Sequence, residues 1–203
     1  MQSSPNLIVF AGPNGSGKST LVEYLLQLNY PIGKHINPDA IASTLTGSYE
    51  ARSFNAQAIA DELRESCLSE RCNFSFETVM SHPSKIEFMQ RARNAGYIVT
   101  LFFVSVEHAE INVERVARRV ALNGHDVPVE RIRRRYGATM AALPDAVRCC
   151  HRTVLFDNSI AFSESISIGP RTVAEIMGTQ ISIFPPTPKW VEKFSAVYPA
   201  RTP

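Results

Sequence analysis

Residues 7–20, LIVFAGPNGSGKST, decide the fold class. The first five residues are apolar and predict a buried strand that ends at Gly12. Residues 12–19 match the spacing G-x-x-x-x-G-K-S/T, in which glycines let backbone N–H groups turn toward phosphate oxygens. Residues 18–28 then predict a helix, whose positive N-terminal end would face the same phosphates. The stretch therefore predicts a strand, a phosphate-binding loop (P-loop, residues 12–19) and a helix.

Each residue type in this loop suits a role toward ATP. Lys18 can reach the β- and γ-phosphates and stabilise transferring charge, and the Ser19 hydroxyl can ligate Mg²⁺. The residues expected to bind the nucleotide are contiguous: Gly12, Pro13, Asn14, Gly15, Ser16, Gly17, Lys18, Ser19 and Thr20.

Strands and helices alternate along the rest of the chain. Such alternation predicts a parallel sheet covered by helices on both faces, a three-layer α/β/α fold formed by one domain over residues 1–203. Ser81 suits the N-cap of its helix, and Phe54 is expected on the inner face of its own. Three prolines in eight residues predict an extended C-terminal segment at about 183–203. The expected strands are 7–11, 34–36, 73–78, 97–106 and 153–159, and the expected helices are 18–28, 51–70, 81–96, 108–122 and 129–142.

Two carboxylates follow expected strands, at the edge where ligands bind in such sheets. Asp39 could be a general base beside the γ-phosphate, or it could cap the N-terminus of a following helix. Glu77 could orient magnesium-bound water or bind substrate, or it could be a surface turn residue. Spacing alone leaves these alternatives open.

Composition and charge restrict the function further. The net charge of +2 and the 44% hydrophobic content are ordinary for a globular protein. Four cysteines without a C-x-x-C pattern predict reduced thiols in a cytoplasmic protein, and the sequence shows no membrane segment. Seven arginines between positions 115 and 135 predict a helical lid at about 115–136 that handles phosphate, although most could form a solvated helix face. Nucleic-acid binding is disfavoured because Tyr136 is the only aromatic residue among them.

The ordered motifs resemble those of the shorter branch of the zeta-toxin family of P-loop kinases. The matching stretches are FAGPNGSGKST, INPDAIA, SFETVMSHPSK, GYIVTLFFVSV, RVARRVALNGHDVPVERIRRRY and LFDNS. The resemblance implies an ATP- and Mg²⁺-dependent kinase that phosphorylates a nucleotide-sugar hydroxyl, typically on UDP-N-acetylglucosamine, with an antitoxin protein as a possible partner.

The resemblance also implies roles for individual residues. Asp39 matches the family's base, and SFETVMSHPSK places Glu77, Thr78 and Ser81 at the substrate. The family's ATP-contacting arginines fall among Arg118, Arg119 and Arg134, of which Arg119 and Arg134 would assist catalysis. His125 belongs to a matching turn and is expected at the substrate.

Two other readings compete with this function. The chain could phosphorylate another small hydroxyl substrate, because AIASTLTG follows Asp39 where long family members place an arginine. Alternatively, it could be a non-catalytic or nucleic-acid-associated NTP-binding protein, which would not require Asp39.

Overall fold

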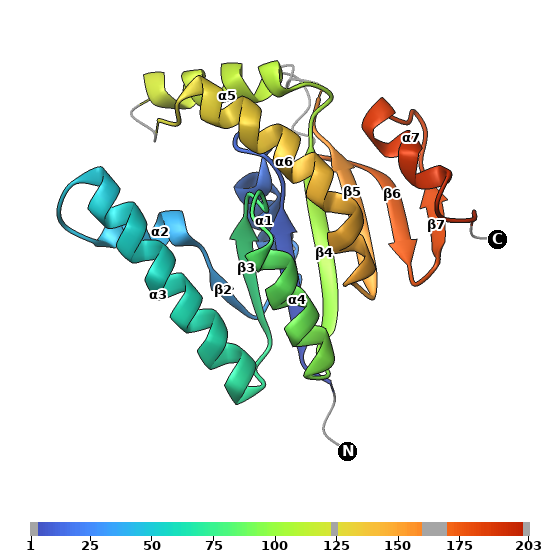
Figure 1. The fold of residues 1–203 in the computed structure, drawn as a ribbon, viewed down its shortest axis with the longest axis horizontal. Helices are drawn as coiled ribbons and strands as arrows, with labels where there is room; N and C mark the ends of the chain where they lie inside the picture. The colour runs from blue at the N-terminus through green and yellow to red at the C-terminus, as the bar shows by residue number, and fades with distance from the viewer. Residues whose placement is uncertain (1–3, 123–125, 160–169, 201–203) are drawn as a thin grey trace.

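The computed structural model describes residues 4–122, 126–159 and 170–200, which form a seven-stranded sheet with helices packed against it (Figure 1). His125, an expected substrate residue, lies outside the described residues. The strands are β1 (Asn6–Ala11), β2 (Lys34–Ile36), β3 (Phe74–Thr78), β4 (Ile98–Ser105), β5 (Arg152–Asp157), β6 (Arg171–Met177) and β7 (Gln180–Ile183). The helices are α1 (Lys18–Gln27), α2 (Pro38–Thr44), α3 (Tyr49–Glu70), α4 (Ser84–Asn94), α5 (Ala109–Ala121), α6 (Val129–Arg148) and α7 (Lys189–Ser195).

The strand order is β2-β3-β1-β4-β5-β6-β7, and the first five strands are parallel. Val9 in the central β1 pairs with Phe76 of β3 and Leu101 of β4. Since parallel strands end at the same edge, the segments that follow β1, β2 and β3 meet there. The N–H of Gly12 donates to the Thr78 carbonyl oxygen at 3.3 Å, which ties the start of the P-loop to the end of β3.

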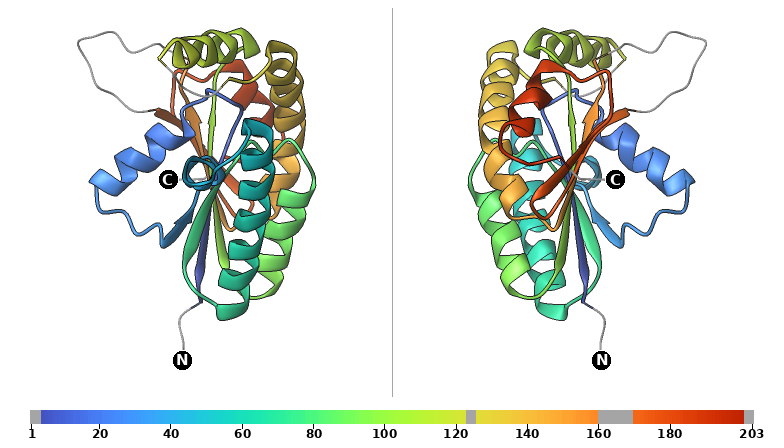
Figure 2. Two further views of the ribbon diagram at one scale, coloured as in Figure 1. Left: turned by 90° about the vertical axis from the view of Figure 1, so that its left-hand side faces the viewer. Right: turned by 90° about the vertical axis from the view of Figure 1, so that its right-hand side faces the viewer.

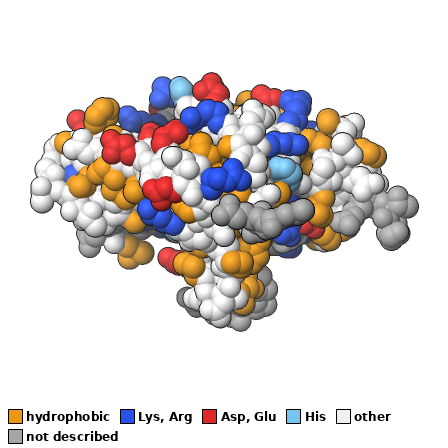
Figure 3. All heavy atoms as spheres, turned by 90° about the horizontal axis from the view of Figure 1, so that it is seen from below, with side chains coloured by type: hydrophobic (Ala, Val, Ile, Leu, Met, Phe, Trp, Pro, Cys, Tyr) orange, Lys and Arg blue, Asp and Glu red, His pale blue; other side chains and the backbone are white. Residues whose placement is uncertain are grey.

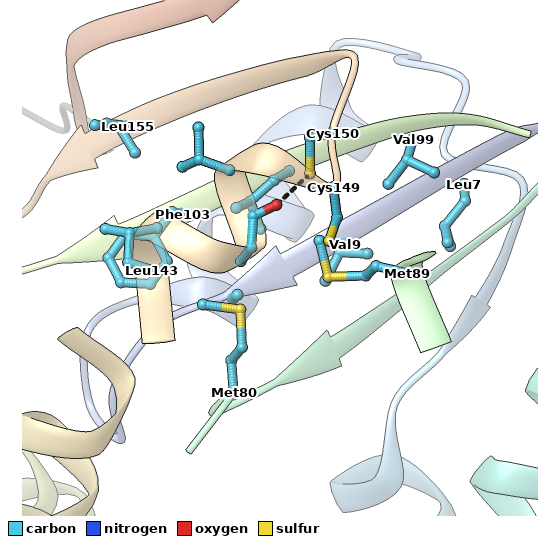
Figure 4. Close-up of a cluster of buried hydrophobic side chains, with 14 of the residues drawn as sticks. Leu7, Val9, Met80, Met89, Val99, Phe103, Leu143, Cys149, Cys150 and Leu155 are labelled. Carbon is cyan, nitrogen blue, oxygen red and sulfur yellow. Dashed lines mark hydrogen bonds between the residues drawn. The ribbon is translucent and has the colours of Figure 1, made fainter. Parts of the chain in front are cut away.

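Helices cover both faces of the sheet, but unequally. Figure 2 shows α1 on one face and α3, α4 and α6 on the other. Alternate β1 residues face opposite sides: Ile8 and Phe10 pack with Leu21 of α1, whereas Leu7 and Val9 belong to the larger opposite cluster. Figure 4 shows this larger cluster, to which α6 contributes Leu143. The three-layer α/β/α architecture is confirmed.

The second half of α6 differs from the sequence expectation. The helix continues to Arg148, past Pro144, whereas the sequence predicted an end at residue 142. A proline inside a helix leaves the carbonyl four residues earlier without its N–H partner. That carbonyl belongs to Met140, and Nζ of Lys193 in α7 donates to it at 3.2 Å. A tertiary hydrogen bond thus satisfies the backbone group that Pro144 frees.

Two further local expectations are wrong. Helix α4 begins at Ser84 with Pro83 at its N-cap, so Ser81 lies before the helix and does not cap it. Phe54 is 76% exposed instead of facing inward. The buried residues of α3 lie farther along, at Ala56, Ala60, Arg64 and Cys67.

The C-terminal region contains regular structure that the sequence did not predict. Strands β6 and β7 extend the sheet antiparallel beside β5, and α7 occupies part of the segment expected to be extended. Trp190 of α7 packs at 6.0 Å from the Phe103 ring, measured between centroids. Its indole N–H donates to Oδ1 of Asp157, at the end of β5, at 3.4 Å. The prolines therefore form a short connection between β7 and a packed helix.

The surface is mixed at the end of the molecule where β1 begins. Seen from below, basic and acidic side chains lie next to one another with hydrophobic side chains between them (Figure 3). Among the described residues, no helix is long and apolar enough to cross a membrane.

Candidate active site

The P-loop follows β1 and takes its shape from backbone conformations that favour glycine. Gly12 has a φ of +149°, and a Cβ there would lie 2.0 Å from the carbonyl oxygen of Val104 in β4. Gly17 has a φ of +103°, and a Cβ there would lie 2.5 Å from Nδ2 of Asn158. Both positions therefore require glycine, one for contact with β4 and the other for contact with the segment after β5.

Lys18 curls back over the loop that precedes it. Its Nζ donates to the carbonyl oxygens of Gly12 and Pro13, each at 2.9 Å. Burial lowers the pKa of Lys18 to about 8, Glu77 and Asp39 oppose this shift, and Arg119 adds to it. An anion in contact with Nζ would stabilise the charged form of this amine further, as expected for a phosphate site.

Glu77 is the penultimate residue of β3 and receives hydrogen bonds from two directions. Ser19 Oγ donates to its Oε2 at 2.8 Å, and Asn37 Nδ2 donates to its Oε1 at 2.7 Å. His35 Nε2 lies 3.3 Å from the same Oε1. Burial opposes ionisation, but the contacts with His35 and Ser19 and the charge of Lys18 keep the pKa of Glu77 below its usual value. The surface-turn alternative for Glu77 is wrong, because this carboxylate is buried and hydrogen-bonded.

The Ser19 and Glu77 side chains fit Mg²⁺. Both offer hard oxygen atoms, and Mg²⁺ bound to a nucleotide needs few protein ligands because phosphates and water supply the others. The described residues contain no group of three or more His, Cys, Asp or Glu side chains that could hold a metal without the nucleotide. The loop also contains Ser16 Oγ, a buried hydroxyl oxygen without a hydrogen-bond partner.

The helix-cap alternative for Asp39 is wrong. Asn37 is the N-cap of α2, and its Oδ1 accepts from the backbone N–H of Asp39 at 2.8 Å and of Ala40 at 3.3 Å. The Asp39 carboxylate is therefore not needed as a cap, and it lines the cleft above the P-loop. Its charge opposes the lowering of the Lys18 pKa, so the carboxylate lies within electrostatic range of this amine across the cleft.

The cleft has a volume of about 550 Å³ and brings most of the expected site residues together. Its walls come from the P-loop, from the segments after β2 and β3, and from α3, α4, α5 and α6. The expected residues that line it are Asn14, Gly15, Gly17, Lys18, Ser19, Thr20, Asp39, Glu77, Thr78, Ser81 and Arg119. Gly12, Pro13 and Ser16 are buried within the loop itself.

The lid arginines divide into two sets. Arg119 lines the cleft, as do Arg131 and Arg135, which the sequence analysis did not single out. Arg118 and Arg134 are exposed and are not among the residues that line it. Helical spacing could have predicted that Arg135 faces inward. It lies three residues after the buried Ile132 and four before the buried Thr139, on the same face of α6. Arg135 Nη1 also lies 3.5 Å from Oδ1 of Asn14.

Two asparagines outside the P-loop support its backbone. Asn112 of α5 donates through Nδ2 to the Asn14 carbonyl oxygen, and Asn158 Nδ2 donates to the Ser16 carbonyl oxygen at 2.8 Å. Arg115 of α5 donates in turn to the Asn158 carbonyl oxygen at 2.7 Å. These contacts join the loop to the lid region and to the end of β5. The motif LFDNS marked this region, but its asparagine was not assigned a role.

A P-loop after a central parallel strand, with a carboxylate at the end of the neighbouring strand, defines the fold of a P-loop kinase. The model of one family, described as Zeta toxin, matches residues 1–160. The chain therefore belongs to the zeta toxin family, which confirms the resemblance seen in the motifs.

Individual relatives agree with this assignment. An uncharacterized protein of Haemophilus influenzae is 28% identical over 139 residues, which cover 64% of this chain and 91% of that protein. A chain of the AvrRxo1-ORF1:AvrRxo1-ORF2 complex with sulphate ions superposes with a TM-score of 0.68 at 16% identity over 96% of this chain. This chain spans only 63% of that one. A structure of the same complex with ATP gives a TM-score of 0.67.

A chain from the PezAT chromosomal toxin-antitoxin system of Streptococcus pneumoniae has a TM-score of 0.59 at 18% identity. The match covers 83% of this chain and 75% of that one. At these identities the solved structures show that the fold is shared.

Proposed function

We propose that this protein is an ATP- and Mg²⁺-dependent kinase that transfers the γ-phosphoryl group to a hydroxyl of a nucleotide sugar, with UDP-N-acetylglucosamine as the first acceptor to test. One observation carries the proposal: the Asp39 carboxylate and the Lys18 ammonium line one cleft, and the charge of Asp39 acts on the pKa of Lys18. A non-catalytic NTP-binding protein would not need a carboxylate at that place.

The proposed reaction uses each group according to its position. ATP lies with its phosphates in the P-loop, where backbone N–H groups and Lys18 hold the β- and γ-phosphates. Ser19 and Glu77 would hold Mg²⁺, which would neutralise phosphate charge when bound. Asp39 removes the proton from the acceptor hydroxyl. The hydroxyl oxygen then bonds to the γ-phosphorus as the bond between the γ-phosphorus and ADP breaks. Arg119 and Arg135 balance the charge of the transferring group.

Membership of the zeta toxin family supports a phosphotransferase. The ATP complex of a structural neighbour supports ATP as the donor, and the toxin-antitoxin system of another supports an antitoxin protein as a partner. We further propose a cytoplasmic location, in keeping with four cysteines that form no disulfide among the described residues.

The experiment is a product screen. The purified protein is incubated with ATP, Mg²⁺ and a panel of UDP-sugars and small hydroxyl compounds, and products are identified by mass spectrometry. The proposal expects one acceptor to gain a phosphoryl group with wild-type protein and far more slowly with Asp39→Asn. A product formed equally fast by both proteins would exclude Asp39 as the base. Phosphorylation of only non-nucleotide acceptors would instead select the alternative of another small hydroxyl substrate.

A further inference from the structure

An arginine with almost no exposed surface lies in the wall of the cleft. Arg64 of α3 is 1% exposed, and its guanidinium carbon lies 5.0 Å from the centroid of the Phe76 ring. It pairs with Asp61, one helical turn earlier in α3. Because arginine is rarely buried completely, its place in the wall of a substrate cleft needs an explanation.

A second cation reaches the same carboxylate from α4. Nζ of Lys85 lies 2.8 Å from Oδ1 of Asp61, and the Lys85 side chain is 19% exposed. Burial opposes ionisation of Asp61, but hydrogen bonds from Lys85 and the charge of Arg64 keep its pKa below the usual value. One carboxylate therefore serves two cations, and this end of the cleft keeps an excess of positive charge.

The two cations and the P-loop line the same cleft, with the proposed base also in its wall. Arg64 and Lys85 are accompanied there by Gln57, Ser81 and His82. The P-loop holds the donor phosphates, so a molecule that presents a hydroxyl to Asp39 can extend toward Arg64 and Lys85. Asp61 is 57% exposed, so an incoming anion could replace it without leaving it buried and unpaired.

We propose that Arg64 and Lys85 form a phosphate subsite for the acceptor, which selects phosphate-bearing acceptors over neutral sugars. This inference rests on the proposed function, because it concerns the acceptor side of the same cleft. The planar guanidinium can hold two oxygens of one phosphate, and the lysine adds a second charge-assisted hydrogen bond. Asp61 pairs with both cations in the absence of the acceptor and therefore competes with the acceptor phosphate for them.

The chain contains a matched pair that serves as a control. Arg91 of α4 pairs with Glu65 of α3, and its guanidinium carbon lies 5.3 Å from the Phe88 ring centroid. This pair also joins α3 to α4 and stacks on a phenylalanine. Its side chains are 55% and 52% exposed, and neither lines the cleft. Changes at Glu65 or Arg91 therefore test the loss of an ion pair between the two helices without altering the subsite.

The first test measures binding without turnover. UDP is titrated calorimetrically into protein whose P-loop is saturated with a non-hydrolysable ATP analogue and Mg²⁺. Lys85→Gln and Arg64→Lys should each weaken UDP binding about tenfold or more, since the first removes a charge-assisted contact and the second loses the two-point contact of the guanidinium. Asp61→Asn should strengthen UDP binding, whereas Glu65→Gln and Arg91→Gln should leave it within about twofold. If Arg64→Lys fails to fold, Lys85→Gln and Asp61→Asn decide the outcome.

The second test compares two acceptors that share the N-acetylglucosamine sugar. With UDP-N-acetylglucosamine, Lys85→Gln should raise the KM for the acceptor and leave the KM for ATP unchanged. With N-acetylglucosamine, which lacks the diphosphate, it should change neither. Unchanged UDP affinity in Lys85→Gln and Asp61→Asn would overturn the subsite, as would preference of the wild-type protein for the neutral sugar. Unchanged UDP affinity leaves the kinase proposal standing, because that proposal is tested separately by Asp39→Asn. Preference for the neutral sugar would also replace the nucleotide-sugar acceptor by another small hydroxyl substrate.

Discussion

Ser19 Oγ donates a 2.8 Å hydrogen bond to Oε2 of Glu77, although the two residues are 58 positions apart in the chain. Pairing of β1 with β3 brings them together, because the P-loop follows β1 and Glu77 nearly ends β3. With its proton directed at Glu77, the Ser19 oxygen keeps its lone pairs for a cation.

Glu77→Gln should therefore weaken the use of Mg²⁺ more than the binding of ATP. Glutamine keeps the size of the side chain but loses the charge that orients Ser19 and balances the metal. We expect the Mg²⁺ concentration for half-maximal rate to rise about 10–100-fold, as for other groups that orient metal ligands. Mg²⁺ titrations at saturating ATP measure this. An unchanged Mg²⁺ requirement would remove Glu77 from the metal site.

Lys18→Ala should abolish most phosphoryl transfer without unfolding the protein. The side chain interacts with carbonyl oxygens of its own loop, so its loss removes charge stabilisation and little packing. We expect the rate to fall about 10²–10³-fold, equivalent to about 3–4 kcal/mol of transition-state stabilisation. Steady-state kinetics and thermal unfolding measure the two effects. Turnover near that of the wild type would contradict catalysis in this loop.

Asp39→Asn should lower turnover about 10²–10⁴-fold while the affinity for ATP stays close to that of the wild type. Asparagine keeps the shape but cannot accept the proton. The stability should barely change, since Asn37 and not Asp39 caps α2. The acceptor found by the product screen serves as substrate, and a calorimetric titration gives the ATP affinity. Full activity would leave the proposed mechanism without a base.

ATP binding should couple to proton uptake through Lys18. Its pKa of about 8 means that the free amine loses its proton as the pH rises above that value, whereas bound phosphates would favour the charged form. Binding of an ATP analogue should therefore take up a proton above about pH 8, and its affinity should fall as the pH increases. Calorimetry in buffers of different ionisation enthalpy measures the uptake, which Lys18→Met should eliminate.

As the pH increases, the stability of the unliganded protein should rise, whereas the affinity for the ATP analogue falls. The folded-state pKa of Lys18 is below its ordinary value of 10.5, so the unfolded chain binds more protons between about pH 8 and 10.5. The contribution of Lys18 to the free energy of unfolding should therefore increase through this window. The difference between the wild type and Lys18→Met isolates it, and a decrease would contradict the assigned pKa.

The lid, helix α5 and the first half of α6, should become more protected when nucleotide binds. Arg119, Arg131 and Arg135 line the cleft together, and bound phosphates would add charge-assisted hydrogen bonds to these guanidinium groups. Amide hydrogen exchange should slow at 115–122 and 126–136 on addition of an ATP analogue with Mg²⁺, while α4 serves as an internal reference. Equal exchange with and without nucleotide would count against a closing lid.

The sequence predicted the parallel part of the fold because its signals are local. The run LIVFA followed by the P-loop marks a buried strand and a glycine-rich turn within a few residues. The strands β3 and β4 are likewise marked by their own apolar residues. Since parallel strands end at one edge, this pattern also predicted that Asp39 and Glu77 would approach the loop.

Long-range packing explains what the sequence did not predict. Arg64 reads as a solvated residue of a charged helix, and only the placement of Phe76 beneath it and of Lys85 beside it makes it part of the cleft. Likewise, the carbonyl oxygen that Pro144 frees in α6 accepts a hydrogen bond from Lys193, far along the chain. Propensity cannot report a partner that distant in sequence.

The strands added beside β5 have a consequence for engineering the protein. The family model ends at residue 160, before β6, β7 and α7. Without them, one edge of β5 would lose its ladder partner, and Phe103 would lose the indole that packs on it. A shortened chain that kept every catalytic group would thus expose an unpaired strand edge beside an apolar surface and tend to self-associate. The C-terminal hairpin and helix therefore protect this edge of the sheet from aggregation.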